Sequence, residues 1–175
     1  EAKASEMEHA IRKHCTVHND EDPAFYKSLS AKVENLLDQH QEDWEKLAEE
    51  LERLRGEALV GRKQGEEGMS KEATTFYEHI ASEAFEDGKV PVEAKDKMKV
   101  LMESIVDILQ DSIGSIDFWN SADKQKQTRS KVKAALTSTG IHELKKNRER
   151  VAVEIMKLSK NRHDTLIKGA TGGDA

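Results

Sequence analysis

"DEDPAFYKSLSAKVENLLDQH", residues 20–40, carries the clearest structural signal in the chain. Asp22 precedes Pro23, and an acidic N-cap followed by proline at the first helical position is a typical helix start. After this start, apolar side chains recur every three or four residues, which is the period of one helix face. They are Tyr26, Leu29, Val33, Leu36 and Leu37. The stretch predicts an amphipathic helix from residue 23 to about residue 40.

The same period continues on both sides of this stretch, and strand-like alternation bounded by turns is almost absent. Glycines and further helix starts divide the rest of the chain into helices at about 2–18, 42–60, 71–87, 91–114, 121–140 and 141–167. We therefore expect an all-α fold, a multi-helix bundle of six to seven helices with no sheet. The expected organisation is a single helical domain over 1–168 and a flexible tail at 169–175.

The composition is that of a globular helical protein. Of the 175 residues, 36% are hydrophobic, 35% charged and 5% aromatic, which is too apolar for a fully disordered chain. No apolar stretch approaches the roughly 20 residues that a membrane span needs, and no signal peptide opens the sequence. Cys15 is the single cysteine, which excludes an internal disulfide and agrees with a reducing compartment. We expect a cytoplasmic protein without a membrane partner.

Charge is distributed unevenly along the chain. Residues 1–120 hold 15 Lys and Arg against 28 Asp and Glu, whereas 121–168 hold 13 against 5, a net charge of +8. Such asymmetry suggests that the C-terminal third faces a different partner, or the acidic part of its own chain. Candidate contacts with a protein or with DNA are Phe118, Trp119, Lys124, Lys131, Lys145 and Arg148.

Each candidate also has a simpler interpretation, which we favour. The aromatic pair at 118–119 lies just before a predicted helix, where large rings commonly anchor the helix start in the core. The lysines and arginines that follow suit an ordinary solvated face. Contact with a partner is the more specific hypothesis for both sets.

Catalytic signatures are absent from the sequence. It contains neither G-x-x-x-x-G-K-[ST] nor G-x-G-x-x-G, the glycine loops that hold phosphates. "HELKK", 142–146, has a lysine where a zinc-binding helix needs its second histidine. Two E-x-K triplets, 93–95 and 143–145, lie at helix starts and not on the strands used by metal-dependent nucleases. We predict no catalytic and no cofactor-binding residue.

"HCTVH", 14–18, is the best metal candidate in the sequence. His14 and His18 are four residues apart and share a helix face, with Cys15 beside them. A tetrahedral zinc site needs three or four converging ligands, and only the two histidines clearly converge. We therefore interpret these residues as solvated polar side chains and predict no metal site.

Three stretches together resemble a known family: "MEHAIRKHCTVHNDEDPAFYKSLSAKVENLL" (7–37), "IDFWNSADKQKQTRSKVKAAL" (116–136) and "VEIMKLSKNRH" (153–163). They resemble the C-terminal helical region of the restriction (R) subunit of type I restriction-modification enzymes. The features that carry the resemblance are the acidic-Pro-aromatic helix start, the "DFW" followed by a basic helix, and the closing Lys-x-Arg-His. The likeness spans nearly all of 5–168.

The resemblance implies a chain that is the C-terminal part of a longer multidomain subunit. In this family the parent subunit is an ATP-dependent DNA translocase and endonuclease, so ATP and Mg²⁺ would be used outside this segment. The helical region is associated with docking the motor on the methyltransferase core, made of modification and specificity subunits. We thus expect a non-catalytic assembly domain that meets DNA through the assembled complex. Two alternatives stay open: 121–168 is itself a DNA-contacting surface, or the chain is an unrelated helical self-association scaffold.

Overall fold

The computed structural model describes residues 1–171, and this part of the chain is helical almost throughout. It contains nine α-helices, two short 3₁₀-helices and no β-strand. The predicted all-α multi-helix bundle is therefore confirmed. None of the helices within residues 1–171 combines the length and the apolar character needed to cross a lipid bilayer.

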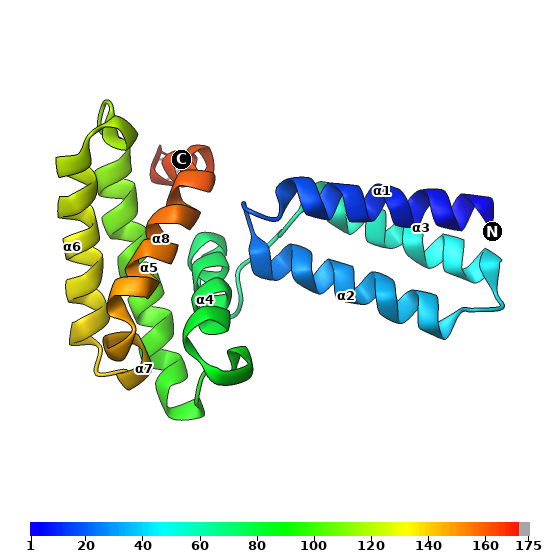
Figure 1. Cartoon of the computed structure of the whole chain (residues 1–175), viewed down its shortest axis with the longest axis horizontal. Coiled ribbons are helices and arrows are strands. Elements are labelled where there is room, and N and C mark those ends of the chain that lie inside the picture. The colour runs from blue at the N-terminus through cyan, green and yellow to red at the C-terminus, as the bar shows by residue number, and fades with distance from the viewer. Residues whose placement is uncertain (172–175) are drawn as a thin grey trace. The chain divides into compact units, whose positions relative to one another are not determined.

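The first compact unit, Glu1–Lys63, is a bundle of three helices (Figure 1). They are α1 (Ala2–His18), α2 (Pro23–Gln39) and α3 (Trp44–Val60), and each packs against the other two. Their apolar stripes meet in one core, formed by Ala4, Met7, Ile11, Cys15, Tyr26, Leu29, Val33, Leu47, Leu51, Leu54 and Ala58. The stretch that opened the sequence analysis supplies the α2 side of this core.

Asp22 fixes the start of α2 and the end of the three-helix unit at the same time. Its carboxylate accepts a hydrogen bond from the backbone N–H of Phe25 at 3.4 Å, as a helix N-cap does. The same carboxylate accepts from Nε and Nη2 of Arg62 at 2.8 and 3.1 Å. The Arg62 guanidinium also lies 5.6 Å from the centre of the Phe25 ring. One buried carboxylate thus joins the start of α2 to the residues that follow α3.

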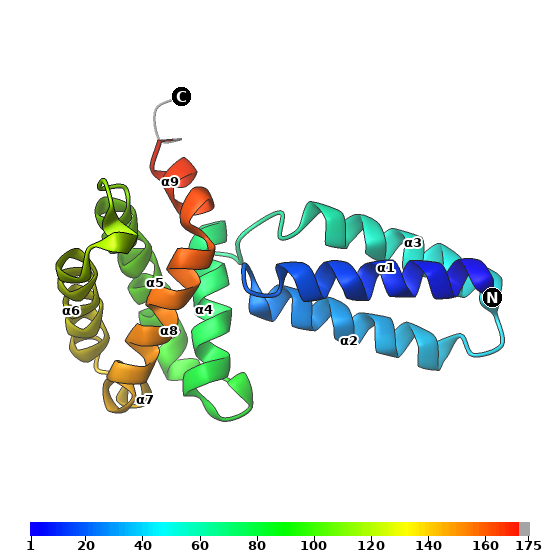
Figure 2. The same cartoon turned by 45° about the horizontal axis from the view of Figure 1, so that its top comes forward.

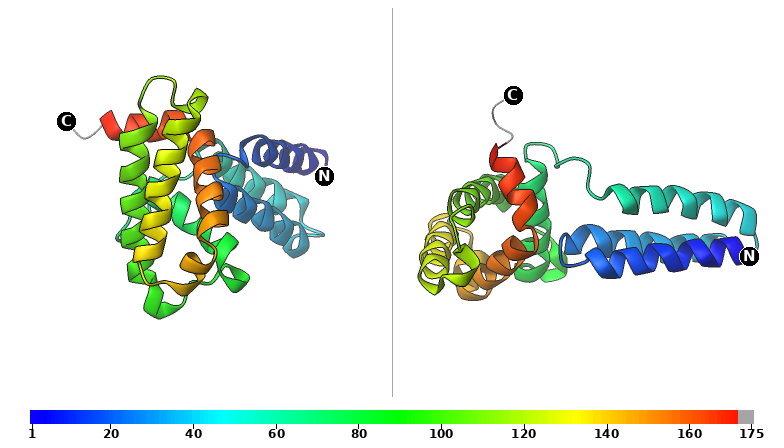
Figure 3. Two further views of the ribbon diagram at one scale, coloured as in Figure 1. Left: turned by 60° about the vertical axis from the view of Figure 1, so that its left-hand side comes forward. Right: turned by 90° about the horizontal axis from the view of Figure 1, so that it is seen from above.

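The second compact unit, Gln64–Ala175, contains the remaining helices (Figure 2). They are α4 (Lys71–Ala84), α5 (Val92–Ile113), α6 (Ala122–Ser138), α7 (His142–Lys146), α8 (Arg148–Asn161) and α9 (His163–Thr171), with 3₁₀-helices η1 (Glu86–Gly88) and η2 (Phe118–Asn120). The long α5 packs against α4, α6 and α9, while α8 packs against α4 and α6 (Figure 3). Their buried side chains form a second core, separate from the first.

The domain organisation differs from the single domain expected over 1–168. The helices gather around two hydrophobic cores, which divide the chain at residues 63 and 64. The segment between α3 and α4 holds three glycines and no helix, so no apolar stripe continues across it. The expected tail, 169–175, is also revised, because residues 169–171 belong to α9. Residues 172–175 of that tail lie outside the described part of the chain.

The last predicted helix, 141–167, is divided into α7, α8 and α9. The breaks fall at Asn147 and Arg162, whose φ and ψ angles of −100° and 16°, and −108° and 14°, leave the helical region. At the second break Arg162 turns inward and pairs with Glu72 of α4. On both sides of each break the segment contributes to the second core, with Leu144 of α7, Ile155 of α8 and Leu166 of α9.

Candidate functional site

Phe118 and Trp119 form the 3₁₀ turn η2 that leads into α6. The two rings meet edge to face, with centroids 4.7 Å apart. Phe118 is 2% exposed and belongs to the second core, and Trp119 packs against that core while remaining partly accessible. Of the aromatic pair, Phe118 is therefore a core side chain, in agreement with the interpretation that the sequence favoured. Only Trp119 retains an accessible edge.

Trp119 is held by a residue far along the chain. Its Nε1–H donates to Nδ1 of His163 at the start of α9, at 2.9 Å. Asp117, the residue before Phe118, adopts the left-handed conformation with φ of 57°, and it begins the η2 turn that carries the two rings. The backbone oxygens of Phe118 and Trp119 accept from Nε2 of Gln125, which ties the turn to α6. "DFW" and the closing "NRH" thus meet in a single hydrogen-bonded joint.

The four basic candidates come from three neighbouring helices. Lys124 of α6 donates from Nζ to the carbonyl oxygen of Ile116 at 2.7 Å, so it closes the loop before η2. Lys131 of α6 and Lys145 of α7 are exposed. Arg148, also exposed, opens α8 and donates from Nη1 to the Lys145 carbonyl oxygen at 3.0 Å. The four do not converge on one point.

The basic residues of α6 lie along two edges of the helix. Thr128, Val132 and Leu136 form its buried stripe. At 3.6 residues per turn, one edge of this stripe carries Lys126, Arg129 and Lys133, and the other carries Lys124 and Lys131. Lys133 pairs with Glu149 of α8 at 3.3 Å. The helix therefore offers two charged borders and not one continuous basic face.

The "HCTVH" segment is the C-terminal part of α1, and its three ligand-type residues do not converge. Cys15 is buried in the first core, and burial raises the pKa of its thiol, although a hydrogen bond with Ser30 acts in the opposite direction. The rings of His14 and His18 lie 4.3 Å apart, and both approach Tyr26. The cysteine faces the core, so the two histidines lack a third ligand from this segment.

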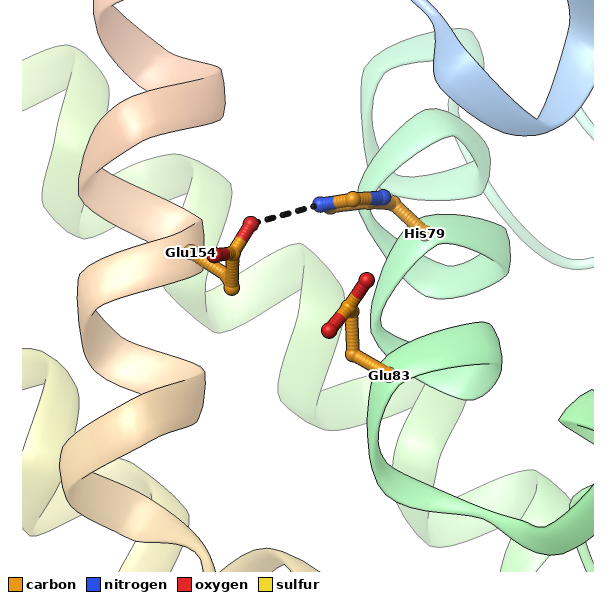
Figure 4. Close-up of side chains that lie close together, drawn as sticks. All are labelled: His79, Glu83 and Glu154. Atoms are coloured by element: carbon orange, nitrogen blue, oxygen red, sulfur yellow. Dashed lines mark hydrogen bonds and ion pairs between the residues drawn. The ribbon is translucent and has the colours of Figure 1, made fainter.

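A different set of side chains does converge, and the sequence analysis did not identify it. His79 and Glu83 of α4 and Glu154 of α8 bring one ligand atom each to within 4.8 Å of one another (Figure 4). Nε2 of His79 lies 3.3 Å from Oε2 of Glu154. The available signal was the spacing of four between His79 and Glu83, which places both on one helix face. Glu154 is 75 residues from His79, and only the packing of α8 on α4 brings it there.

Comparison with protein-family models, with curated proteins and with solved structures finds no match to this chain.

Proposed function

We propose that this chain is a non-catalytic helical assembly module of a type I restriction enzyme R subunit. It would dock the motor on the methyltransferase core formed by the modification and specificity subunits, in the cytoplasm. ATP and Mg²⁺ would be bound by other domains of the parent subunit. The proposal rests on the resemblance of the three stretches at 7–37, 116–136 and 153–163 to that family.

The observation that carries the proposal is that residues of the resembling motifs form contacts between helices. The acidic-Pro entry supplies Asp22, which caps α2 and pairs with Arg62. "DFW" and "NRH" supply the hydrogen bond between Trp119 and His163. Each motif thus stabilises a junction between helices. Such a chain is suited to holding surfaces in place for another protein.

Size-exclusion chromatography tests the proposal directly. The purified chain is mixed with an assembled modification–specificity complex from the same restriction system, and co-elution at a defined ratio is expected. Elution of the two at their separate volumes, at micromolar concentrations of each, would contradict docking. A stable dimer of the chain alone, with no co-elution, would favour the self-association scaffold.

A second candidate function is direct contact with DNA, favoured by one observation. α6 packs against both α7 and α8, so its exposed lysines and the exposed Lys145, Lys146 and Arg148 belong to neighbouring surfaces. Phosphate contacts lose affinity steeply as salt rises, because counterions are released on binding. Fluorescence anisotropy with a duplex at 50 and 200 mM salt should then show a drop in affinity of about tenfold or more. No binding at 50 mM salt would remove this candidate.

A further inference from the structure

We propose that His79, Glu83 and Glu154 form a zinc-binding site that joins α4 to α8. This inference is independent of the proposed assembly function, since it concerns only the second compact unit. It rests on the spacing of the three side chains, on the rigidity of the helices that carry them and on the charge at the site.

The spacing of the ligand atoms suits a tetrahedral zinc ion. Zinc binds histidine nitrogen and carboxylate oxygen at about 2.0–2.2 Å, so neighbouring ligands in a tetrahedron lie about 3.3–3.4 Å apart. The separation of 3.3 Å between the His79 and Glu154 atoms matches this edge. It is long for a direct hydrogen bond from nitrogen to oxygen, which is usually about 2.9–3.0 Å. Glu83 completes the set, because its ligand atom lies within 4.8 Å of the other two and rotation of its side chain can bring the carboxylate closer.

The two helices are joined beside the cluster and at one end of the helix pair. Ile80 of α4 and Ile155 of α8, each adjacent in sequence to a proposed ligand, are fully buried in the second core. At the far end of the helix pair, Arg162 donates from Nε and Nη2 to the Glu72 carboxylate at 3.0 and 2.8 Å. Ligands on helices that are fixed in this way need little reorganisation to bind an ion.

Charge at the site favours a divalent cation. The cluster holds two carboxylates, and one of them is paired with an arginine: Nη1 of Arg150 lies 3.1 Å from Oε2 of Glu83. Zinc would compete with Arg150 for this carboxylate. Arg150 has a second anchor, because its Nη2 donates to the Glu83 carbonyl oxygen at 2.7 Å. The guanidinium can therefore stay in place while the carboxylate turns to the metal.

The donor set selects the class of metal. Imidazole nitrogen combined with carboxylate oxygen suits zinc and its neighbours in the first transition row, whereas Mg²⁺ and Ca²⁺ prefer shells made of oxygen alone. The side chains of His79, Glu154 and Glu83 are 12%, 25% and 35% exposed. The site is thus shielded by protein on one side and reached by solvent on the other, which leaves the fourth position of a tetrahedron to water.

Isothermal titration of the EDTA-treated full chain with zinc chloride tests the site. The His14→Gln variant is the starting protein, so that the adjacent His14 and His18 rings do not form a second zinc site. We expect one zinc ion per chain, and a rise of roughly 5–10 °C in the melting temperature at a zinc concentration 100 times Kd.

Three substitutions and two matched controls locate the ion. His79→Ala, Glu83→Gln and Glu154→Gln should each weaken zinc binding by at least tenfold, and Arg150→Gln should strengthen it by removing the competitor. Glu149→Gln changes a carboxylate on the same helix that pairs with Lys133, and His142→Ala removes an exposed histidine of α7. Both controls should bind zinc as the starting protein does.

The three ligand variants also guard against a folding artefact. Glu83 is the most exposed ligand, so Glu83→Gln should keep the far-UV circular dichroism spectrum and still lose zinc. Absence of zinc binding by the starting protein at millimolar zinc would overturn the site. Undiminished binding by Glu83→Gln and Glu154→Gln would also overturn it, since the ion would then lie elsewhere.

Discussion

The hydrogen bond from Trp119 to His163 joins two residues that are 44 positions apart in the sequence, and it ties η2, just before α6, to the start of α9. Trp119→Phe keeps most of the ring and removes the Nε1–H donor, which leaves Nδ1 of His163 without its partner. We expect the free energy of unfolding to fall by about 1 kcal/mol. Trp119→Ala, which also removes the ring, should cost about 3 kcal/mol or more.

Urea denaturation followed by circular dichroism measures both changes without relying on tryptophan fluorescence. Trp44→Phe is the matched control, because Trp44 begins α3 in the other unit and is 42% exposed. Its free energy of unfolding should change by less than about 0.5 kcal/mol. Equal losses for Trp119→Phe and Trp44→Phe would show that the bond to His163 contributes nothing.

Cys15 gives the chain a pH dependence of known sign. Burial raises the pKa of its thiol above the ordinary value of about 8.5. The folded state therefore holds the thiol proton more tightly than the unfolded state, so the protein is most stable below that value and loses stability as pH rises above it. Tyr77, whose pKa is also raised by burial and by Glu66 and Asp96, adds to the loss at higher pH.

The difference between wild type and Cys15→Ala isolates the thiol, since Tyr77 is common to both. Urea denaturation at pH 7.0 and pH 9.5 should show a larger loss of stability for wild type than for Cys15→Ala. An equal loss in the two proteins would mean that the thiol titrates alike in the folded and unfolded states.

At the scale of elements, the pair formed by Arg162 and Glu72 links the end of α8 to the start of α4. The two side chains are 7% and 12% exposed. Removing one member of a buried pair leaves the other charge without compensation, which typically costs 3–5 kcal/mol. We expect Arg162→Met to lower the free energy of unfolding by about this amount.

The double variant Arg162→Met with Glu72→Gln should recover a large part of that loss, because no buried charge remains. Lys133→Gln breaks the more exposed pair with Glu149 and should cost less than about 1 kcal/mol. Chemical denaturation of wild type, Arg162→Met, Glu72→Gln and the double variant completes the double-mutant cycle. Additive effects of the two buried substitutions would contradict the direct coupling of α8 to α4.

Helix starts were the part of the fold that the sequence predicted well, because their signals are local. Asp22, Ser70 and Ser121 each accept a hydrogen bond from a backbone N–H three residues later, as N-caps do. The breaks at Asn147 and Arg162 were missed. Arg162 leaves the helix to reach Glu72, which is 90 residues away, and no pattern within 141–167 contains that information.

The candidate sites show the same division between local and distant information. Periodicity predicts which side of a helix is buried, but it does not extend to Phe118, which lies in η2 before α6. The favoured core position and a surface contact therefore both stayed open for Phe118. The His79 and Glu83 spacing was visible in the sequence, whereas their meeting with Glu154 depends on how α8 packs. The basic charge of 121–168 was visible too, and helical spacing alone already predicts that these charges do not share one face of α6.

The whole molecule is organised around two separate hydrophobic cores, one in each compact unit. The C-terminal unit, 64–175, holds the larger core, which all its α-helices help to form. We therefore expect a fragment of residues 64–175 to fold on its own, with a cooperative urea transition. Residues 1–63 form a three-helix core of a size at which isolated domains are only marginally stable. A fragment 64–175 without a cooperative transition would show that its core depends on the first unit.

Competition for the methyltransferase core tests the central proposal, which is that this chain carries a docking surface without help from the rest of the motor subunit. The full-length R subunit and the modification–specificity complex are held at fixed concentrations while the separate chain is added, and sedimentation velocity follows the fraction of R subunit in the complex. Our account predicts that this fraction falls steadily as the chain occupies the shared surface. A fraction that stays constant at a large excess of folded chain would contradict it.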